Sequence, residues 1–376
     1  MSEKPAGKSS SGESPARSAS GESPSGHTGR DSTRRSLAER FPGLVCDLDG
    51  VVYRGAQALP HAIESLADAR RSGARIVYAT NNASRPPAVV AEALRKLGIA
   101  LDDADVLTSS VAGARQLAEQ LPTGAKVLAI GGPGVAEALH AVDLRPVDPA
   151  DAERVSVDAV LQGYGKDVTA AALGEAAYAI QGGARWVATN DDLTLPTERG
   201  VAPGNGSLVR AVRLAVDTDP TVVGKPGALL YELAAQALGT EADHTLGIGD
   251  RLETDVEGAH AAGMSALHVL TGVHGPADLV RAHADSRPRF VAEDLRALNR
   301  SYEEPQRALD GRWTMETAAA SGSGAGSSFR IDYTDRSDSG GPEWIDRLRL
   351  ALRVLWEAID AQVLTSDEAV AALPSR

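Results

Sequence analysis

Residues Leu44–Tyr53 read LVCDLDGVVY, an apolar run that stops at two aspartates, Asp47 and Asp49, and continues through Gly50. Such a run predicts a buried β-strand. Because alternate residues of an extended chain point the same way, both carboxylates face one space beyond the strand's carboxyl end, where open α/β sheets bind ligands. One carboxylate can attack phosphorus while another protonates the leaving group. Asp47 suits the first task and Asp49 the second, although aspartate pairs also occur in turns and helix caps.

Outward from this stretch, short apolar runs alternate with longer Ala-rich segments of helical spacing. Alternation of this kind is typical of a parallel sheet covered by helices, so we expect the α/β class. The predicted strands are residues 44–46, 75–79, 126–130, 158–162, 186–188, 221–223, 245–248 and 266–269. The predicted helices are residues 62–72, 87–97, 112–120, 170–181, 206–216, 227–238 and 254–262.

A second predicted strand, RIVYA, ends in three small polar residues, Thr80, Asn81 and Asn82. Thr80 offers a hydroxyl and Asn81 a side-chain amide, and backbone N–H groups at a strand-to-helix turn can hold phosphoryl oxygens. The same residue types also cap helices. The motif is therefore compatible with a phosphate site or with a structural turn.

Two further strands also end in charged residues. Lys225 follows the run TVV, and a lysine there can neutralise charge on a nucleophile and on a transferring phosphoryl group. Asp250 follows TLGIG, and Asp255 lies at the start of the next predicted helix. Together with Asp47 these carboxylates form an oxygen-rich site of the type that Mg²⁺ accepts.

The ordered set DxDGV, TNN, GKP and GDxxxxD resembles the haloacid dehalogenase-like phosphatase superfamily, from Leu44 to about Leu298. The resemblance implies that Asp47 is the nucleophile, Asp49 the general acid and base, and Lys225 the charge stabiliser. It further implies that Thr80, Asn81 and Asn82 bind the phosphoryl group. The dehalogenase branch lacks the second aspartate, so cleavage of a carbon–halogen bond is disfavoured.

The resemblance also implies a Mg²⁺ cofactor. Its expected protein ligands are Asp47, Asp250 and the backbone carbonyl of Asp49. Asp255, Arg251 and Gly50 are expected to support this site.

The spacing of the motifs places the cap. Asp47 and Thr80 lie 33 positions apart, room for one helix and one strand, whereas Thr80 and Lys225 lie 145 apart. The second gap must hold an α/β cap, which resembles that of the NagD/p-nitrophenylphosphatase-like subgroup. By this resemblance Asn190 and Asp191 are candidates for substrate binding. Phosphomutases normally carry their cap in the first gap, which disfavours that chemistry.

The expected architecture is a Rossmann-like parallel-sheet core with an inserted α/β cap and a small C-terminal α+β extension. We place the core at 41–122 and 220–299, the cap at 123–219, and a linker with a small module at 300–376. Residues 1–36 are rich in Ser, Gly, Glu and Pro, so residues 1–40 are expected to be a disordered tail. In the module, residues 312–316 and 328–334 are predicted to pair as a hairpin with a long loop, followed by an amphipathic helix over 342–362.

The composition of the 376-residue chain limits the classes of partner that it is expected to bind. The net charge of −13 makes nucleic acid an unexpected partner. No apolar run reaches the roughly 18 residues that span a bilayer, so no membrane association is expected. Cys46 is the only cysteine, which excludes an intrachain disulfide and favours a reducing cytoplasm. A homodimer is possible.

Two other functions fit the sequence less well than phosphatase chemistry does. The run KVLAIGGPGV at residues 126–135 fits neither a dinucleotide-binding motif nor a phosphate loop with a Lys-Ser/Thr pair. A non-catalytic scaffold is disfavoured by the intact set of charged motifs. Among substrates, the C-terminal extension resembles that of actinobacterial glycerol-3-phosphate phosphatases. We therefore expect a small phosphomonoester, glycerol 3-phosphate first and 2-phosphoglycolate or a nucleoside monophosphate next.

Overall fold

The computed structural model describes residues 35–197, 199–335 and 343–375. A six-stranded parallel sheet with the order β15-β14-β13-β1-β4-β5 forms the core. Its strands are β1 (Gly43–Cys46), β4 (Arg75–Thr80), β5 (Val106–Thr108), β13 (Thr245–Gly249), β14 (Ser265–Val269) and β15 (Phe290–Ala292). Cys46 lies level with Ile248 of β13 and with Tyr78 of β4, so the carboxyl ends of the three central strands meet at one edge.

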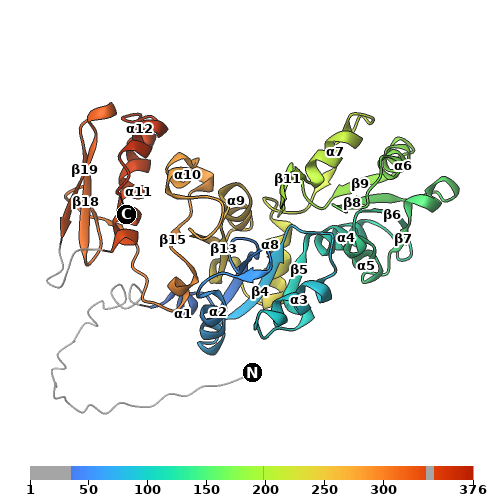
Figure 1. Cartoon of the computed structure of the whole chain (residues 1–376), viewed down its shortest axis with the longest axis horizontal. Coiled ribbons are helices and arrows are strands. Elements are labelled where there is room, and N and C mark those ends of the chain that lie inside the picture. The colour runs from blue at the N-terminus through green and yellow to red at the C-terminus, as the bar shows by residue number, and fades with distance from the viewer. Residues whose placement is uncertain (1–34, 198, 336–342, 376) are drawn as a thin grey trace, which may run out of the picture.

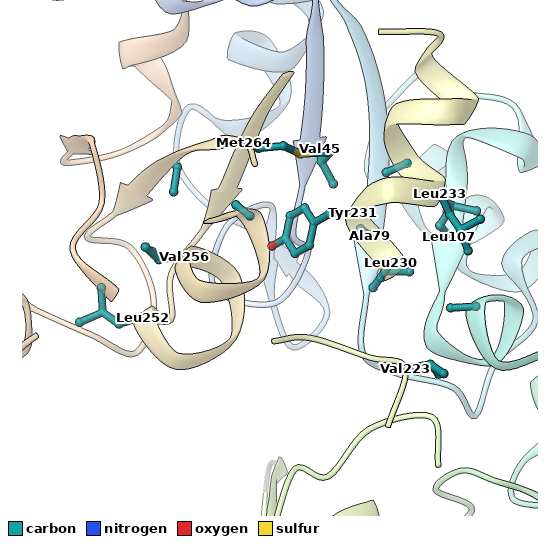
Figure 2. Close-up of a cluster of buried hydrophobic side chains, with 14 of the residues drawn as sticks. Val45, Ala79, Leu107, Val223, Leu230, Tyr231, Leu233, Leu252, Val256 and Met264 are labelled. Atoms are coloured by element: carbon teal, nitrogen blue, oxygen red, sulfur yellow. The ribbon is translucent and has the colours of Figure 1, made fainter. Parts of the chain in front are cut away.

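Helices cover both faces of this sheet because successive strand residues point to opposite sides. Val45 and Val77 belong to the hydrophobic cluster on one face, and Leu44 and Ile76 to the cluster on the other. In the first cluster, Tyr231 lies among the strand residues (Figure 2). The core helices are α2 (Ala62–Arg71), α3 (Pro87–Lys96), α4 (Ser109–Gln120), α8 (Leu229–Leu238), α9 (Glu257–Ala261) and α10 (Pro276–Arg281).

A second, five-stranded parallel sheet has the order β12-β9-β8-β6-β7 and forms the inserted cap. Its strands are β6 (Lys126–Ile130), β7 (Arg145–Val147), β8 (Ala159–Gln162), β9 (Arg185–Ala188) and β12 (Thr221–Val222). It is accompanied by α5 (Pro133–His140), α6 (Ala170–Gln181), α7 (Asn205–Arg213) and a hairpin of β10 (Thr194–Thr197) and β11 (Gly200–Pro203). The cap and the C-terminal module lie on opposite sides of the core (Figure 1), and the predicted fold class is confirmed.

The strand that precedes Lys225 differs from the prediction in one respect. The strand at residues 221–223 was expected in the core, within 220–299, but β12 pairs with β9 in the cap sheet. An apolar run indicates a strand without indicating its sheet, and Thr221 and Val222 lie level with Val187 and Ala188 of β9. Lys225 therefore lies directly after the last cap strand, where the chain returns to the core.

The C-terminal module contains an antiparallel sheet with the order β16-β17-β18-β19, together with two helices. The strands are β16 (Gln306–Arg307), β17 (Trp313–Thr314), β18 (Ala318–Ser323) and β19 (Arg330–Asp335). The helices are α11 (Trp344–Asp360) and α12 (Ser366–Ala371). The amphipathic helix is confirmed within the described residues, and Pro342 lies outside them.

The predicted hairpin in this module is wrong. Strands β17 and β19 do not pair with each other, because β18, in the segment expected to be a loop, lies between them. Ala318 and Ala320 of β18 are buried against Leu350 and Val354 of α11. Small residues permit this close approach of helix and strand, so the Ala and Gly content that suggested a loop belongs to a packed strand.

The N-terminal boundary also differs from the prediction. Residues 1–34, which carry most of the predicted disordered tail, lie outside the described residues. The segment up to residue 40, however, includes helix α1 (Leu37–Arg40). Ser36 and Glu39 form a capping box, and Leu37 is buried in the core. This short helix was not predicted, because the Ser-rich composition of the segment indicated disorder.

Several short elements complete the described chain. The segment after Asp49 forms a small hairpin of β2 (Tyr53–Arg54) and β3 (Gln57–Ala58). A π-helical turn spans Leu252–Val256. Single 3₁₀ turns lie at Asp103–Asp105, Pro149–Arg154, Ala242–His244, Ala284–Ser286, Leu295–Leu298 and Gly326–Ser328. Within the described ranges, no helix is both long and apolar enough to cross a membrane.

Candidate active site

Three carboxylates converge at the edge where the central core strands end. Asp47 follows β1, and its backbone N–H donates to the carbonyl of Ile248 at 2.9 Å, which continues the pairing of β1 with β13. Asp250 follows β13, and Asp255 lies in the π-helical turn that comes next. One carboxylate oxygen from each of Asp47, Asp250 and Asp255 lies within 4.8 Å of the others.

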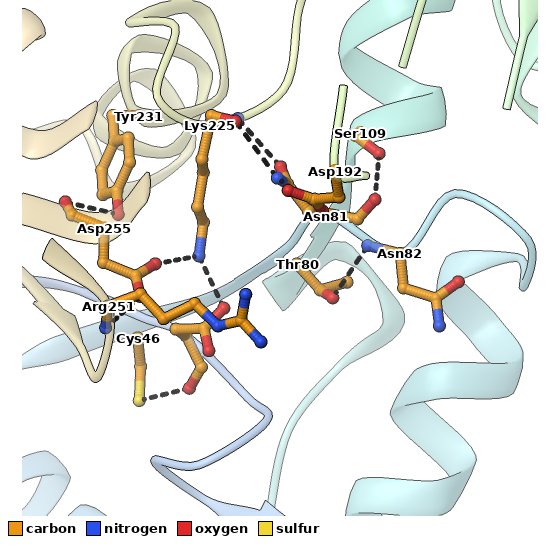
Figure 3. A network of polar contacts seen from close by, with 11 residues as sticks. Cys46, Thr80, Asn81, Asn82, Ser109, Asp192, Lys225, Tyr231, Arg251 and Asp255 are labelled. Carbon is orange, nitrogen blue, oxygen red and sulfur yellow. Dashed lines mark hydrogen bonds and ion pairs between the residues drawn. The ribbon is translucent and has the colours of Figure 1, made fainter. Parts of the chain in front are cut away.

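Lys225 reaches this cluster from the end of the cap. Its ammonium donates to Oδ1 of Asp47 at 2.6 Å and to Oδ1 of Asp255 at 2.8 Å (Figure 3). The side chain is 2% exposed. Burial lowers the pKa of Lys225, but Asp255 and Asp47 raise it, and the net pKa lies well above its ordinary value. The lysine is therefore a permanent cation in the site.

The surroundings of Asp47, the candidate nucleophile, shift its pKa in opposing directions. Burial raises the pKa of Asp47, while Lys225 lowers it, and the neighbouring Asp255 and Asp250 raise it further. The net shift is upward. Because like charges crowd the site, additional positive charge is needed to keep Asp47 ionised and ready to attack.

The π-helical turn orients Asp255. One of its carboxylate oxygens accepts a hydrogen bond from the backbone N–H of Arg251 at 3.1 Å. Its backbone carbonyl accepts from the hydroxyl of Tyr231 at 3.0 Å, and the ring of Tyr231 lies 5.8 Å from Nζ of Lys225. The sequence predicted a helix from Thr254, whereas the structure has a π-helical turn followed by α9. This turn places the carboxylate beside the lysine.

Asp250 is 2% exposed and tightly enclosed. Its Oδ2 accepts a hydrogen bond from the backbone N–H of Val273 at 2.6 Å. Burial, and then the charge of Asp255, raises the pKa of Asp250 to about 6. Gly50 has a φ of +80°, and a Cβ there would lie 2.4 Å from Oδ2 of Asp250. Only glycine allows the loop after β1 to approach this carboxylate so closely.

Asp49 lies at the open side of the site. Its side chain remains accessible to solvent, yet desolvation by the surrounding protein raises its pKa, opposed by Arg85, by a hydrogen bond with Tyr53 and by Arg251. A raised pKa helps a carboxyl group to carry the proton that a general acid must deliver. The geometry thus separates a half-buried carboxylate at Asp47 from an exposed one at Asp49.

The TNN motif lies beside Lys225 and makes well-defined hydrogen bonds. Oγ1 of Thr80 accepts from the backbone N–H of Asn82 at 3.1 Å. The side chain of Asn81 binds the backbone of Lys225 at both ends: Oδ1 accepts from its N–H at 2.8 Å, and Nδ2 donates to its carbonyl at 3.2 Å. The amide of Asn81 therefore fixes the catalytic-lysine candidate, a contact that sequence reasoning missed.

The cap segment from Asn190 to Asp192 approaches the TNN motif of the core. Asn190 is buried, and its Nδ2 donates to the backbone carbonyl of Asn81 at 2.7 Å, whereas Asp191 is exposed. The next residue, Asp192, accepts a hydrogen bond from Nδ2 of Asn81 at 3.3 Å. Burial raises the pKa of Asp192, opposed by its hydrogen bond with Asn81 and by the charge of Arg251.

Comparison with known proteins agrees with this geometry. A haloacid dehalogenase-like hydrolase model matches residues 44–145, and a second HAD-hydrolase-like model matches residues 222–298. D-glycerol 3-phosphate phosphatase of Mycobacterium tuberculosis is 45% identical over 266 residues, which cover 70% of this chain and 73% of the relative. The chain belongs to the haloacid dehalogenase-like hydrolase family.

Other relatives support the same class. A 5′-nucleotidase of Bacillus subtilis is 34% identical over 62% of this chain and 88% of its own length. The solved structure of glycerol phosphate phosphatase from M. tuberculosis in complex with magnesium has a TM-score of 0.75 and 38% identity, covering 86% of this chain and 92% of that one. The p-nitrophenyl phosphatase of Archaeoglobus fulgidus has a TM-score of 0.63 and 28% identity, covering 69% and 98%. The prediction of a phosphatase of this haloacid dehalogenase-like family is confirmed.

The site of this haloacid dehalogenase-like phosphatase fits magnesium. Three carboxylates within 4.8 Å carry more negative charge than the single ammonium of Lys225 offsets. Carboxylate oxygens are the ligands that Mg²⁺ prefers, and a divalent cation relieves the repulsion from Asp255 that, after burial, raises the pKa of Asp250. Mg²⁺ is therefore the cofactor, as the sequence led us to expect.

Sequence reasoning missed several groups around the site. Tyr53 and Arg85 interact with Asp49, and Tyr231 supports Asp255. Arg85 lies three positions after the TNN motif, a spacing that can place it on the same turn. By contrast, nothing in the sequence separates Asp192 from the adjacent Asp191. Their difference in orientation depends on the cap loop.

Proposed function

We propose that this enzyme hydrolyses glycerol 3-phosphate to glycerol and phosphate through a phosphorylated Asp47. The contact that carries the chemistry is the pairing of Asp47 with the buried ammonium of Lys225 at 2.6 Å. The substrate is supported by the 45% identity with D-glycerol 3-phosphate phosphatase of M. tuberculosis, which extends across core and cap.

In the first step a carboxylate oxygen of Asp47 attacks phosphorus, and the bond between phosphorus and the ester oxygen breaks. Asp49 gives its proton to the departing alkoxide, so glycerol leaves neutral. In the second step Asp49 accepts a proton from water as the water oxygen attacks phosphorus. The acyl phosphate bond breaks, phosphate leaves, and Asp47 is restored as a carboxylate.

The remaining residues hold the phosphoryl group and its charge. Lys225 balances the charge that shifts between Asp47 and the phosphoryl oxygens. Thr80, Asn81 and Asn82 are the residues that we propose to bind those oxygens. Asp47, Asp250 and the backbone carbonyl of Asp49 would hold Mg²⁺, with Asp255, Arg251 and Gly50 in support. Bound Mg²⁺ supplies positive charge that favours the approach of an anionic nucleophile to an anionic substrate.

We further propose that the cap, over about residues 123–219, selects the leaving group, and that the core spans 41–122 and 220–299. The segment from Asn190 through Asp191 to Asp192 is the part of the cap that approaches Asn81 of the core. Asn190 and Asp191 are the cap residues that we propose to bind substrate, and Asp192, which accepts a hydrogen bond from Asn81, is a third candidate.

The second candidate substrate class is a nucleoside monophosphate, which is favoured by the identity of 34% with a Bacillus subtilis 5′-nucleotidase. Another is 2-phosphoglycolate. A panel of phosphomonoesters ranked by kcat/KM at saturating Mg²⁺ tests the assignment. Glycerol 3-phosphate is expected to rank first, and a nucleotide ranked at least tenfold higher would replace it.

Two remaining proposals concern the protein's surroundings. The buried thiol of Cys46 fits a cytoplasmic location, where no disulfide is required.

A homodimer is also proposed. Light scattering on the purified chain gives its mass directly, and a monomer mass at micromolar concentration would refute the dimer.

A further inference from the structure

The carboxylate of Asp250 is held from one side by the loop that leads out of β14. The backbone N–H of Val273 donates to Oδ2 of Asp250 at 2.6 Å, and that of His274 donates to its backbone carbonyl at 3.2 Å. A Cβ at Gly272 would lie 1.8 Å from Oδ2. The position of this loop therefore sets the position of Asp250.

The loop is fixed by several contacts with the core and by the helix that follows it. The hydroxyl of Thr271 donates to the backbone carbonyl of Gly50 at 2.7 Å, and the backbone N–H of Leu252 donates to Nδ1 of His274 at 3.0 Å. On the core side, Nε2 of the buried His268 lies 3.0 Å from the backbone carbonyl of His274. On the other side the loop continues without interruption into α10, whose Leu279 and Val280 are fully buried. The orientation of α10 therefore contributes to how the far end of the loop meets Asp250.

The C-terminal module holds α10 in place. Nε1 of Trp356 in α11 donates to the backbone carbonyl of Leu279 at 2.8 Å, and both residues are buried. Leu352, Leu355 and Trp356 belong to the same hydrophobic cluster as Leu279. The hydrogen bond from the indole N–H is the directional contact among these, because it joins Trp356 to one backbone carbonyl of α10.

We propose that Trp356 is a positioning residue for the metal site, acting through α10 and the loop over residues 271–275 on Asp250. The inference rests on the proposed function in one respect, that Asp250 is a ligand of Mg²⁺. It gives the C-terminal module a task in the reaction: the module keeps the metal-binding carboxylate in register with Asp47.

The chain contains a matched control. Trp313, in β17 of the same module, donates from Nε1 to a carboxylate oxygen of Glu357 at 3.0 Å. That bond lies within the module and does not involve α10. Trp356→Phe and Trp313→Phe remove the same chemical group from the same module. Only the first change reaches the loop that holds Asp250.

The experiment measures Mg²⁺ binding to the full-length, metal-free protein by isothermal titration calorimetry, so the readout is independent of turnover. Trp356→Phe is expected to raise the Kd of Mg²⁺ about fivefold, as loss of one hydrogen bond implies. At saturating Mg²⁺ its kcat and its KM for phosphomonoester are expected to match those of the unaltered enzyme. Trp313→Phe is expected to leave the Kd unchanged.

Asp250→Asn separates the inference from the assignment on which it rests. If Asp250→Asn binds Mg²⁺ as tightly as the unaltered protein, the metal assignment fails and the inference falls with it. If Asp250→Asn loses binding but Trp356→Phe keeps a Kd within twofold of the unaltered protein, the inference alone is overturned. An equal rise in Kd for both tryptophan variants would also overturn it, since the effect would then be general loosening of the module.

Discussion

The ammonium of Lys225 lies 2.6 Å from a carboxylate oxygen of Asp47, although 178 positions separate the two residues in the chain. The lysine is 2% exposed and also bonds Asp255. A buried cation between two carboxylates offsets their mutual repulsion only while it is present. Removing it leaves the charges of Asp47 and Asp255 unpaired in a largely buried region.

Lys225→Met is therefore expected to lower both activity and stability. The kcat should fall by roughly 10²- to 10³-fold because the stabilising charge at the reacting group is lost. Breaking a buried ion pair should reduce the free energy of unfolding by about 3 kcal/mol. Lys96→Met is the control, because Lys96 is exposed and pairs with Glu92 on the surface. Urea unfolding should show a change within about 0.5 kcal/mol for that variant. Unchanged kcat in Lys225→Met would refute the assigned role.

The effect of Asp49→Asn on the first chemical step is expected to depend on the leaving group of the substrate. An alkoxide needs a proton to depart, so turnover of glycerol 3-phosphate should fall by about 10³-fold. The p-nitrophenolate ion departs without one, so stopped-flow absorbance should show a burst approaching one p-nitrophenol per enzyme, followed by slow turnover. An equal loss with both substrates and no burst would argue against Asp49 as acid and base.

Gly50→Ala and Gly55→Ala separate backbone strain from crowding at the metal site. Both glycines have positive φ, +80° and +61°, but only at Gly50 would a Cβ meet Asp250. Gly55→Ala should cost about 1 kcal/mol in the free energy of unfolding and leave Mg²⁺ binding intact. Gly50→Ala should also weaken Mg²⁺ binding at least about tenfold by displacing Asp250. Equal Mg²⁺ affinity in the two variants would show that the close approach is unimportant.

The raised pKa of Asp250 predicts a pH dependence with a definite sign. Its pKa rises from 3.8 to about 6 on folding, so the folded metal-free protein binds this proton more tightly than the unfolded chain does. The resulting stabilisation is present below pH 3.8 and is lost as the pH rises through about 6. Asp250→Asn lacks this titration. The melting temperature of the metal-free protein, relative to that of Asp250→Asn, should therefore decrease between pH 4 and pH 7, and a constant difference would contradict the shift.

Mg²⁺ binding should depend on the same titration of Asp250, but the affinity for Mg²⁺ should rise with pH where the stabilisation falls. Mg²⁺ must displace the proton from Asp250, so its apparent affinity is expected to rise with pH up to about 6 and then level off. Calorimetric titrations in buffers of different ionisation enthalpy report the protons released. Release should be greater at pH 5 than at pH 8.

The sequence predicted the acidic centre because local pattern and global topology agree there. Asp47 and Asp250 each end an apolar run, and parallel pairing of β1 with β13 brings those ends together. No comparable rule identified the sheet to which a run belongs, so β12 was assigned to the core although it pairs in the cap. Lys225 was nevertheless identified correctly as part of the cluster, because the chain re-enters the core at that residue.

Side-chain orientation was the part that sequence could not supply. Whether Asn81 offers its amide to a substrate or to the backbone of Lys225 depends on a contact across 144 positions. Likewise, Asp191 and Asp192 are adjacent and chemically identical, and the fold of the cap loop alone decides which one reaches Asn81. In β18 the small residues indicate a loop, and only packing against α11 explains the strand.

The central claim is that Asp47 carries the phosphoryl group during turnover, and trapping the adduct tests it most directly. Asp49→Asn mixed with p-nitrophenyl phosphate and Mg²⁺, then quenched in acid, should gain the mass of one phosphoryl group, with peptide mass spectrometry locating it on Asp47. The double variant with Asp47→Asn should gain none. Phosphate on any other residue, or turnover that survives Asp47→Asn, would contradict the account.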